Sequence, residues 1–135
     1  MSAFQSADQL KKVLGNFFEL LAADPVIGPK LLESKLIIKF NYREPDASIT
    51  IDISGEKAVF TYDDAVKKPI VEMSMKADTA HKFWMGDVNL IVALARREIT
   101  AKGPIPKILK LLPIIKPAYK LYPDYIKDKG VAVLR

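Results

Sequence analysis

Residues 35–76 read KLIIKFNYREPDASITIDISGEKAVFTYDDAVKKPIVEMSMK, and apolar and polar side chains alternate along most of this stretch. Within residues 35–43 the even positions are apolar and the odd positions are polar, with Ile37 as the exception. Alternation with a period of two is typical of strands that bury one face and leave the other in water. The pattern therefore predicts four strands, over residues 35–43, 48–54, 58–62 and 70–76.

Short polar segments separate these predicted strands. Glu44-Pro45-Asp46 and Gly55-Glu56-Lys57 contain residues that favour turns, and residues 63–68 form a polar loop. One-sided strands that follow each other in this way favour an antiparallel meander.

A helix is expected before the strands. Ser6 is a candidate N-cap, with Gln9 three residues later completing a capping box. Apolar residues then recur at spacings of three and four from Leu10 to Leu21, which is typical of a helix with one buried side. Pro25 ends this helix, because proline disfavours helical geometry at the residue before it. A short turn of helix is expected at residues 29–34.

Helical patterns return after the strands. Asp78 is expected to cap a short helix that stops at Gly86. Asp87 is expected to cap a second helix, with Arg96 and Arg97 in its last turn, where cations suit the helix dipole.

The remaining segments complete the predicted architecture. Residues 98–102 are expected to form a fifth strand, and Pro104 opens an apolar tail helix that Pro113 and Pro117 must kink or divide. The whole pattern predicts an α+β fold, with a five-stranded, mostly antiparallel sheet and helices packed on one face. The 135 residues fit a single domain, 1–135.

The composition excludes several classes of protein. The chain has no cysteine, which rules out a disulfide scaffold, a thiol nucleophile and a thiolate metal site. Its single histidine rules out a multi-histidine metal centre, and its 50% of hydrophobic residues argue against disorder. The N-terminus lacks a signal-peptide pattern, and no apolar run approaches the roughly 18–20 residues of a membrane span. We therefore expect a soluble, cytoplasmic protein.

The net charge of +5 originates in the last quarter of the chain. Residues 1–99 carry a charge of −1, whereas residues 100–135 carry +6 although they are among the most apolar. Basic and apolar residues together suit membrane surfaces, lipids or acidic partners. Nucleic-acid binding is not expected, because the tail lysines neither cluster nor alternate with exposed aromatic residues. These lysines are Lys107, Lys110, Lys116 and Lys120.

Candidate catalytic groups are few. His81 stands alone, without a partner for acid–base chemistry or company for metal binding, and is expected at the surface or half-buried. Asp52 and Glu72 fall on the predicted wet faces of strands, so we expect solvated carboxylates and not a pair in a pocket. No glycine-rich phosphate-binding motif occurs. We expect no catalytic residue, metal or cofactor.

The tail contains more apolar residues than one core-facing stripe requires. Such a tail packs in the core, meets a partner, or closes over an apolar ligand. Met73, Met75 and Met85 lie close together in the chain, and methionine adapts to varied apolar shapes. One hypothesis is an adaptable pocket between the sheet and the tail.

Several segments occur in an order that resembles a known family. They are IDISGEKAVF (51–60) as a hairpin, Ala77-Asp78 at a helix start, FWMGDVN (83–89) between two helices, and ARREITAKG (95–103) before the apolar tail. This order is similar to that of the sterol carrier protein type 2 (sterol-binding) domain family, from about residue 9 to about residue 127. The resemblance implies a hydrophobic tunnel between sheet and helices that holds fatty acids, acyl chains, sterols or similar lipids. It implies no catalysis by a free-standing domain.

The resemblance also implies which apolar residues line this tunnel. They lie on the fourth strand, the helix pair and the tail: Met73, Met75, Phe83, Trp84, Leu90, Ile91, Leu94, Ile108, Leu112 and Ile115. The tail lysines Lys107, Lys110, Lys116 and Lys120 are expected to attract an anionic head group or, transiently, an anionic membrane.

Two other classes of function stay open at this point. One is a small enzyme acting on a hydrophobic, ketone-like substrate, which needs a carboxylate with a raised pKa inside the pocket. The other is a protein-interaction module that docks its apolar C-terminal helix on a partner, which predicts an exposed tail and no tunnel.

Overall fold

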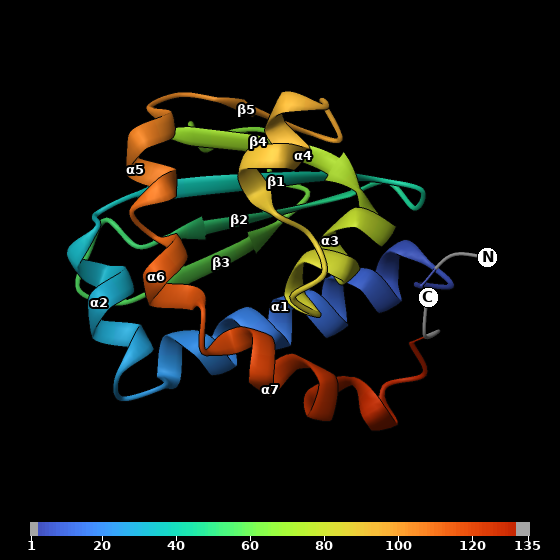
Figure 1. Ribbon diagram of the computed structural model, residues 1–135. Coiled ribbons are helices and arrows are strands. Elements are labelled where there is room, and N and C mark those ends of the chain that lie inside the picture. The colour runs from blue at the N-terminus through green and yellow to red at the C-terminus, as the bar shows by residue number, and fades with distance from the viewer. Residues whose placement is uncertain (1–2, 132–135) are drawn as a thin grey trace.

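The computed structural model describes residues 3–131, and its strands form one sheet with most of the helices against a single face (Figure 1). The first half contains α1 (Ala7–Ala23), α2 (Ile27–Glu33), β1 (Ile37–Arg43), β2 (Ala47–Asp52), β3 (Val59–Tyr62) and β4 (Val71–Lys76). The second half contains α3 (Ala77–Trp84), α4 (Leu90–Ala95), β5 (Ile99–Lys102), α5 (Ile105–Leu109), α6 (Leu112–Ile115), α7 (Ala118–Tyr125) and the 3-10 helix η1 (Ile126–Asp128). The predicted α+β class is confirmed.

The sheet has the strand order β3-β2-β1-β4-β5. β1, β2 and β3 form the antiparallel meander that the sequence predicts, and β5 pairs antiparallel with β4. The extension of the meander to β4 was wrong, because β4 lies parallel to β1, with Met75 opposite Tyr42. Alternation fixes the face that each side chain takes, but it does not fix which strand becomes the neighbour.

The parallel pair arises because the polar loop 63–70 crosses the outer face of the sheet from β3 to β4. Lys67 Nζ lies 2.5 Å from Asp52 Oδ2, and Lys39 Nζ donates to the carbonyl oxygen of Asp64 at 3.1 Å. Asp52 and Lys39 both stand on the polar side of their strands. The loop covers this part of the outer face, where Thr50 is buried although its face is polar.

The inner face of the sheet packs against α1, whose buried side is the predicted apolar stripe. Ser6 caps α1 as predicted, because its hydroxyl accepts from the backbone N–H of Gln9 at 3.0 Å. The reciprocal half of the capping box was wrong. The Gln9 side chain accepts from the backbone N–H of Gln5 at 2.6 Å, one residue before the cap.

Of the two short helices between β4 and β5, α3 begins at Ala77 as the resemblance implies, but both have other N-caps than predicted. Asp78 lies within the first turn of α3, and its carboxylate accepts from the backbone N–H of Ala3 at 2.8 Å. Gly86 ends the turn after α3 with a φ of +87°, and an extended segment follows it. The cap of α4 is therefore Asn89, whose Oδ1 accepts from Val92 N–H at 3.2 Å, and not Asp87.

The prolines divide the tail into α5, α6 and α7, as expected for Pro113 and Pro117. The tail runs back along the helical side of the molecule, with α6 beside α2 and α7 beside α1 and α3 (Figure 1). Its apolar residues Ile108, Ala118 and Tyr122 are buried. The exposed tail predicted by the protein-interaction alternative is therefore not observed. Within residues 3–131, no helix combines the length and apolar character needed to cross a bilayer.

Candidate functional site

A cavity of about 100 Å³ lies between the inner face of the sheet and the helices. All five strands contribute to its wall, and so do α1, α2, α3, α4, α5 and α6. The wall residues are Phe18, Leu21, Ala22, Leu31, Ile38, Phe40, Tyr42, Ile51, Ile53, Phe60, Met73, Met75, Ala80, Phe83, Trp84, Leu90, Ile99, Ile108, Leu111, Leu112 and Ile115. None of these residues carries a charge.

Eight of the ten residues that the sequence assigns to a tunnel line this cavity. Ile91 and Leu94 are outside its wall, and both belong to α4. Successive helical residues point about 100° apart, so the wall position of Leu90 turns Ile91 toward solvent, where it is 62% exposed. Leu94 lies one turn beyond Leu90 and is half-buried against the core. Contact of any of these residues with a ligand stays a prediction.

Wall residues from α1, α2 and the first three strands did not enter the sequence-based set. Phe18 and Leu31 represent the helices, and Phe40, Ile51 and Phe60 represent the strands. The signal for the strand residues was present, because the alternation already placed them on the covered face. The contribution of α2 has no comparable signal, since its position depends on how the chain folds back after Pro25.

Aromatic side chains fix one side of the cavity. The ring centroids of Phe18 and Phe40 are 5.6 Å apart and stacked, which joins α1 to β1. Trp84 packs edge-on against Phe18 at 5.6 Å and against Phe83 at 5.0 Å. These contacts place Trp84 in the wall. Met85, the third methionine of the predicted cluster, is outside the wall.

The polar groups of the wall belong to Tyr42 and Trp84. The Tyr42 hydroxyl is buried and has no hydrogen-bond partner among the described residues. Its burial, and secondarily the nearby Tyr122, hold the pKa of the Tyr42 phenol well above its usual range, so this phenol stays protonated. No group of three or more metal-binding side chains occurs in the described part of the chain.

The residues considered for catalysis lie outside the cavity wall. Asp52 is held by Lys67 and by the Ser54 hydroxyl, which lower the pKa of its carboxyl group to about 2. Glu72 accepts from Asn41 Nδ2 at 2.6 Å on the outer face of the sheet. The expectation of a surface or half-buried His81 was wrong, because its ring is 1% exposed and bonds to Tyr122.

Comparison with known structures identifies the fold. The solution structure of sterol carrier protein domain 2 from Helicoverpa armigera aligns with a TM-score of 0.69, over 89% of this chain and 95% of that chain. The chain has a sterol carrier protein 2-like fold. The sequence identity in this alignment is 20%, which establishes the fold alone. No protein-family model matches the sequence, and the search of curated proteins finds no significant match.

Two further sterol carrier protein 2 structures align over most of their length. The apo protein from Yarrowia lipolytica gives a TM-score of 0.59 at 15% identity, over 88% of this chain and 95% of that chain. The Aedes aegypti protein, solved in complex with palmitate, gives 0.52 at 21% identity, over 79% of this chain and 94% of that chain.

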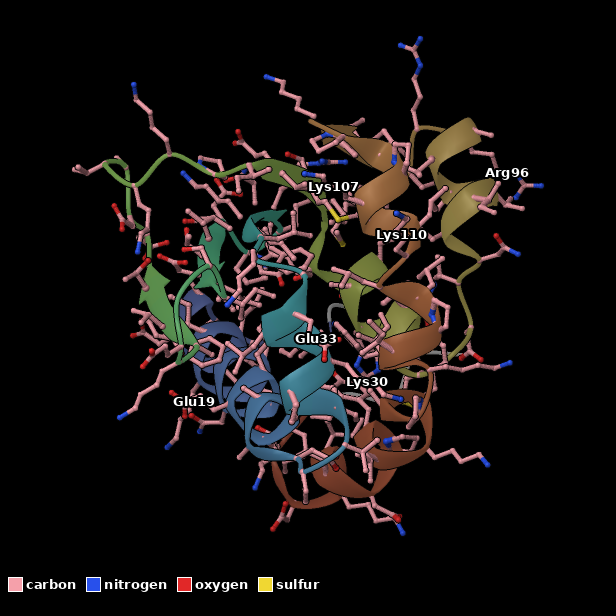
Figure 2. All side chains as sticks on the ribbon, turned by 90° about the vertical axis from the view of Figure 1, so that its left-hand side faces the viewer. Glu19, Lys30, Glu33, Arg96, Lys107 and Lys110 are labelled. Atoms are coloured by element: carbon pink, nitrogen blue, oxygen red, sulfur yellow. The ribbon has the colours of Figure 1, made fainter. Side chains whose placement is uncertain are left out.

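In this sterol carrier protein 2-like fold, basic side chains lie beside the part of the cavity formed by α2 and α5. Leu31 and Ile108 line the cavity, and exposed lysines adjoin them in sequence. Figure 2 shows Lys30, Lys107 and Lys110 on one side of the molecule. Glu33 lies on the same side and partly offsets their charge (Figure 2). Two further lysines, Lys116 and Lys120, are exposed farther along the tail.

Proposed function

We propose that this protein binds or transfers a hydrophobic ligand, such as a fatty acid, a fatty acyl-CoA, a sterol or a similar lipid, in the cavity between sheet and helices. The uncharged, almost wholly apolar wall is the observation that supports this proposal. Apolar surface gains about 25 cal/mol per Å² when it leaves water, so a wall of this kind favours hydrocarbon over a hydrated solute. The palmitate in the Aedes aegypti structure is consistent with the proposal.

The size of the cavity supports an adaptable site. An apolar cavity of about 150 Å³ in another protein stays dry and binds benzene. A cavity of about 100 Å³ therefore holds only part of an acyl chain or sterol unless the wall moves. Met73 and Met75 provide flexible wall side chains. The part of the wall formed by α5 and α6 consists of two short helices, which can shift with little loss of helical structure.

We propose a carrier and not an enzyme. An enzyme acting on a hydrophobic ketone needs an acid or base inside the site. Asp52 and Glu72, the carboxylates considered for that role, are on the outer face of the sheet and are already paired. The cytoplasmic location expected from the sequence is part of this proposal.

The proposal gives the lysines beside the cavity and along the tail a role in attracting anionic groups. Lys107 and Lys110 would hold an anionic head group near α5, and Lys116 and Lys120 would add to the attraction of an anionic membrane. Such exposed charges act over roughly 8 Å at physiological ionic strength. We therefore expect contact with anionic vesicles to weaken with added salt and after the Lys107→Glu and Lys110→Glu substitutions.

Native mass spectrometry of the purified protein tests the proposed function. We expect a co-purifying lipid that organic extraction releases, and a delipidated form that rebinds fatty acid, acyl-CoA or sterol. The fluorescence of Trp84, which lines the cavity, should change on rebinding. Failure of all three ligand classes to bind at micromolar concentration would overturn the proposal.

A further inference from the structure

The hydroxyl group of Tyr42 is a buried polar atom, and Tyr42 belongs to the almost wholly apolar wall of the cavity. Tyr42 is 5% exposed and lines the cavity, and its hydroxyl oxygen has no hydrogen-bond partner among the described residues. A buried hydroxyl without a partner is unfavourable, because it gives up its hydrogen bonds to water without replacing them. Phenylalanine at this position would avoid that loss and keep the packing.

The neighbours of Tyr42 do not supply the missing partner. Phe40 stacks on its ring at 6.1 Å, and Met75 faces it across the β1–β4 pair. The hydroxyl of Tyr122 bonds to Nδ1 of His81 at 2.9 Å and makes no hydrogen bond to the hydroxyl of Tyr42. The indole N–H of Trp84 is a donor only, so it cannot accept the phenol hydrogen. A ligand oxygen can supply the acceptor once the wall side chains move aside, because the Tyr42 hydroxyl itself has almost no accessible surface.

Tyr42 is at the end of the cavity that lies away from the lysines beside α2 and α5, which are Lys30, Lys107 and Lys110. β1 runs from the side of α2 toward the start of α3 (Figure 1). Ile38 and Tyr42 both line the cavity and are four residues apart on β1, which corresponds to about 13 Å in a strand. Lys107 on α5 and Lys110 directly after it are on the opposite side of the molecule from the start of α3 (Figures 1 and 2).

We propose that Tyr42 is a specificity residue that donates a hydrogen bond to a neutral hydroxyl or carbonyl oxygen at the inner end of the ligand. This inference rests on the proposed lipid-binding function and narrows its ligand class. The inner group is neutral, because the wall carries no charged side chain to compensate a carboxylate that leaves water. The preferred ligand is then an elongated amphiphile with an ionic head at the lysines and one oxygen at its far end.

Matched pairs of fatty acids test this inference. The parent acids with 10, 12, 14 and 16 carbons are compared with the same acids carrying a terminal hydroxyl group. Titrations use the full-length wild type, Tyr42→Phe, and Tyr62→Phe as the control. Tyr62 is on β3 of the same sheet, is 39% exposed and is outside the cavity wall.

We expect Tyr42→Phe to lower the affinity for the hydroxy acid relative to its parent by about five-fold or more at the best chain length. Binding of the parent acid should be unchanged or tighter, and Tyr62→Phe should leave the ratio unaltered. A ratio that Tyr42→Phe does not change at any length overturns the inference and leaves the proposed function standing. Binding of neither acid to the wild type at any length overturns the inference, whereas the proposed function is overturned only if acyl-CoA and sterol also fail to bind.

A second measurement avoids dependence on the folding of the variant. Tyrosine labelled with ¹³C at the ζ carbon reports hydrogen bonding of the phenol in the wild-type protein. We expect the Tyr42 resonance to shift on addition of the hydroxy acid and to shift less with its parent. Equal shifts with both acids would contradict the proposed hydrogen bond.

Discussion

Nδ1 of His81 lies 2.9 Å from the hydroxyl oxygen of Tyr122, and this hydrogen bond joins α3 to α7. Both side chains are buried, and the ring of Phe4 packs edge-on against His81 at 6.1 Å. The bond thus connects the tail to the core at a point where water does not compete. It gives the single histidine of the chain a structural role that the sequence pattern did not reveal.

The His81 contact predicts a loss of stability in mild acid. Burial lowers the pKa of His81 and outweighs the opposing effect of Asp78 and Asp87. Because the folded pKa is below the unfolded value of about 6.5, the unfolded chain takes up its proton first as the pH falls. The free energy of unfolding should therefore be highest above pH 6.5 and decrease below it.

Urea unfolding between pH 8 and pH 5 measures this effect. The His81→Gln variant should be less stable at pH 8 and should lose less stability than the wild type over the same interval. Lys57→Gln, at an exposed position between β2 and β3 and not among the groups that shift the pKa of His81, serves as a control that retains the wild-type slope. Equal slopes for wild type and His81→Gln would contradict the assignment.

Gly103 predicts a large difference between two otherwise similar substitutions. Its φ is +108°, and an added Cβ would lie 2.4 Å from the carbonyl oxygen of Ile70. Gly103→Ala should therefore reduce the free energy of unfolding by about 2 kcal/mol or more, since the backbone atom cannot move aside easily. Gly55→Ala meets nothing within 4 Å and should change it by less than about 1 kcal/mol. Chemical unfolding of both variants at pH 7 provides the comparison, and similar losses would be inconsistent with the steric argument.

The sequence predicts which face of the sheet a strand side chain takes better than it predicts which strands lie next to each other. Alternation in residues 35–76 placed Phe40, Met73 and Met75 on the covered face of the sheet, because a period of two depends only on local backbone geometry. The parallel β1–β4 pair was not predicted, because it depends on the path of the loop between β3 and β4. The ion pair of Lys67 with Asp52, which joins residues distant in the chain, holds that loop across the sheet. Pairing of this kind depends on tertiary contacts that local patterns do not encode.

In the candidate site, the direction of a side chain likewise follows more directly from the sequence on a strand than on helix α4. Side chains whose direction follows from a strand, such as Met75, lie in the cavity wall. On α4 the resemblance to a family supplied Ile91 as well as Leu90, but Leu90 lies in the wall, whereas Ile91, about 100° farther round the helix, is exposed to solvent.

The ion pair of Lys67 with Asp52 predicts a second acid-dependent loss of stability, at lower pH. The pKa of the Asp52 carboxyl group is lowered to about 2, so its contribution is present above about pH 4 and is lost as the pH falls toward 2. Lys67→Met should reduce the free energy of unfolding by about 1 kcal/mol at pH 7, as is usual for a partly exposed pair.

The difference between wild type and Lys67→Met should then shrink toward zero near pH 2. Urea unfolding from pH 7 to pH 2 measures it, and Lys68→Met at the adjacent exposed position is the control. A difference that persists unchanged at pH 2 would show that lost packing, and not the ion pair, causes the effect.

The last prediction concerns the cavity itself and uses two leucines of the tail. Leu112 lines the cavity from α6, whereas Leu121 is on α7, is 39% exposed and is outside the wall. Leu112→Trp adds a large ring to a cavity of only about 100 Å³, so it should reduce fatty-acid affinity by about ten-fold or more. Leu121→Trp adds the same ring at the surface and should bind like the wild type. Isothermal titration of the delipidated proteins makes the comparison, with circular dichroism to verify that both variants are folded. Because the two variants share their chemistry and differ only in position, equal affinities would show that the ligand does not occupy this cavity.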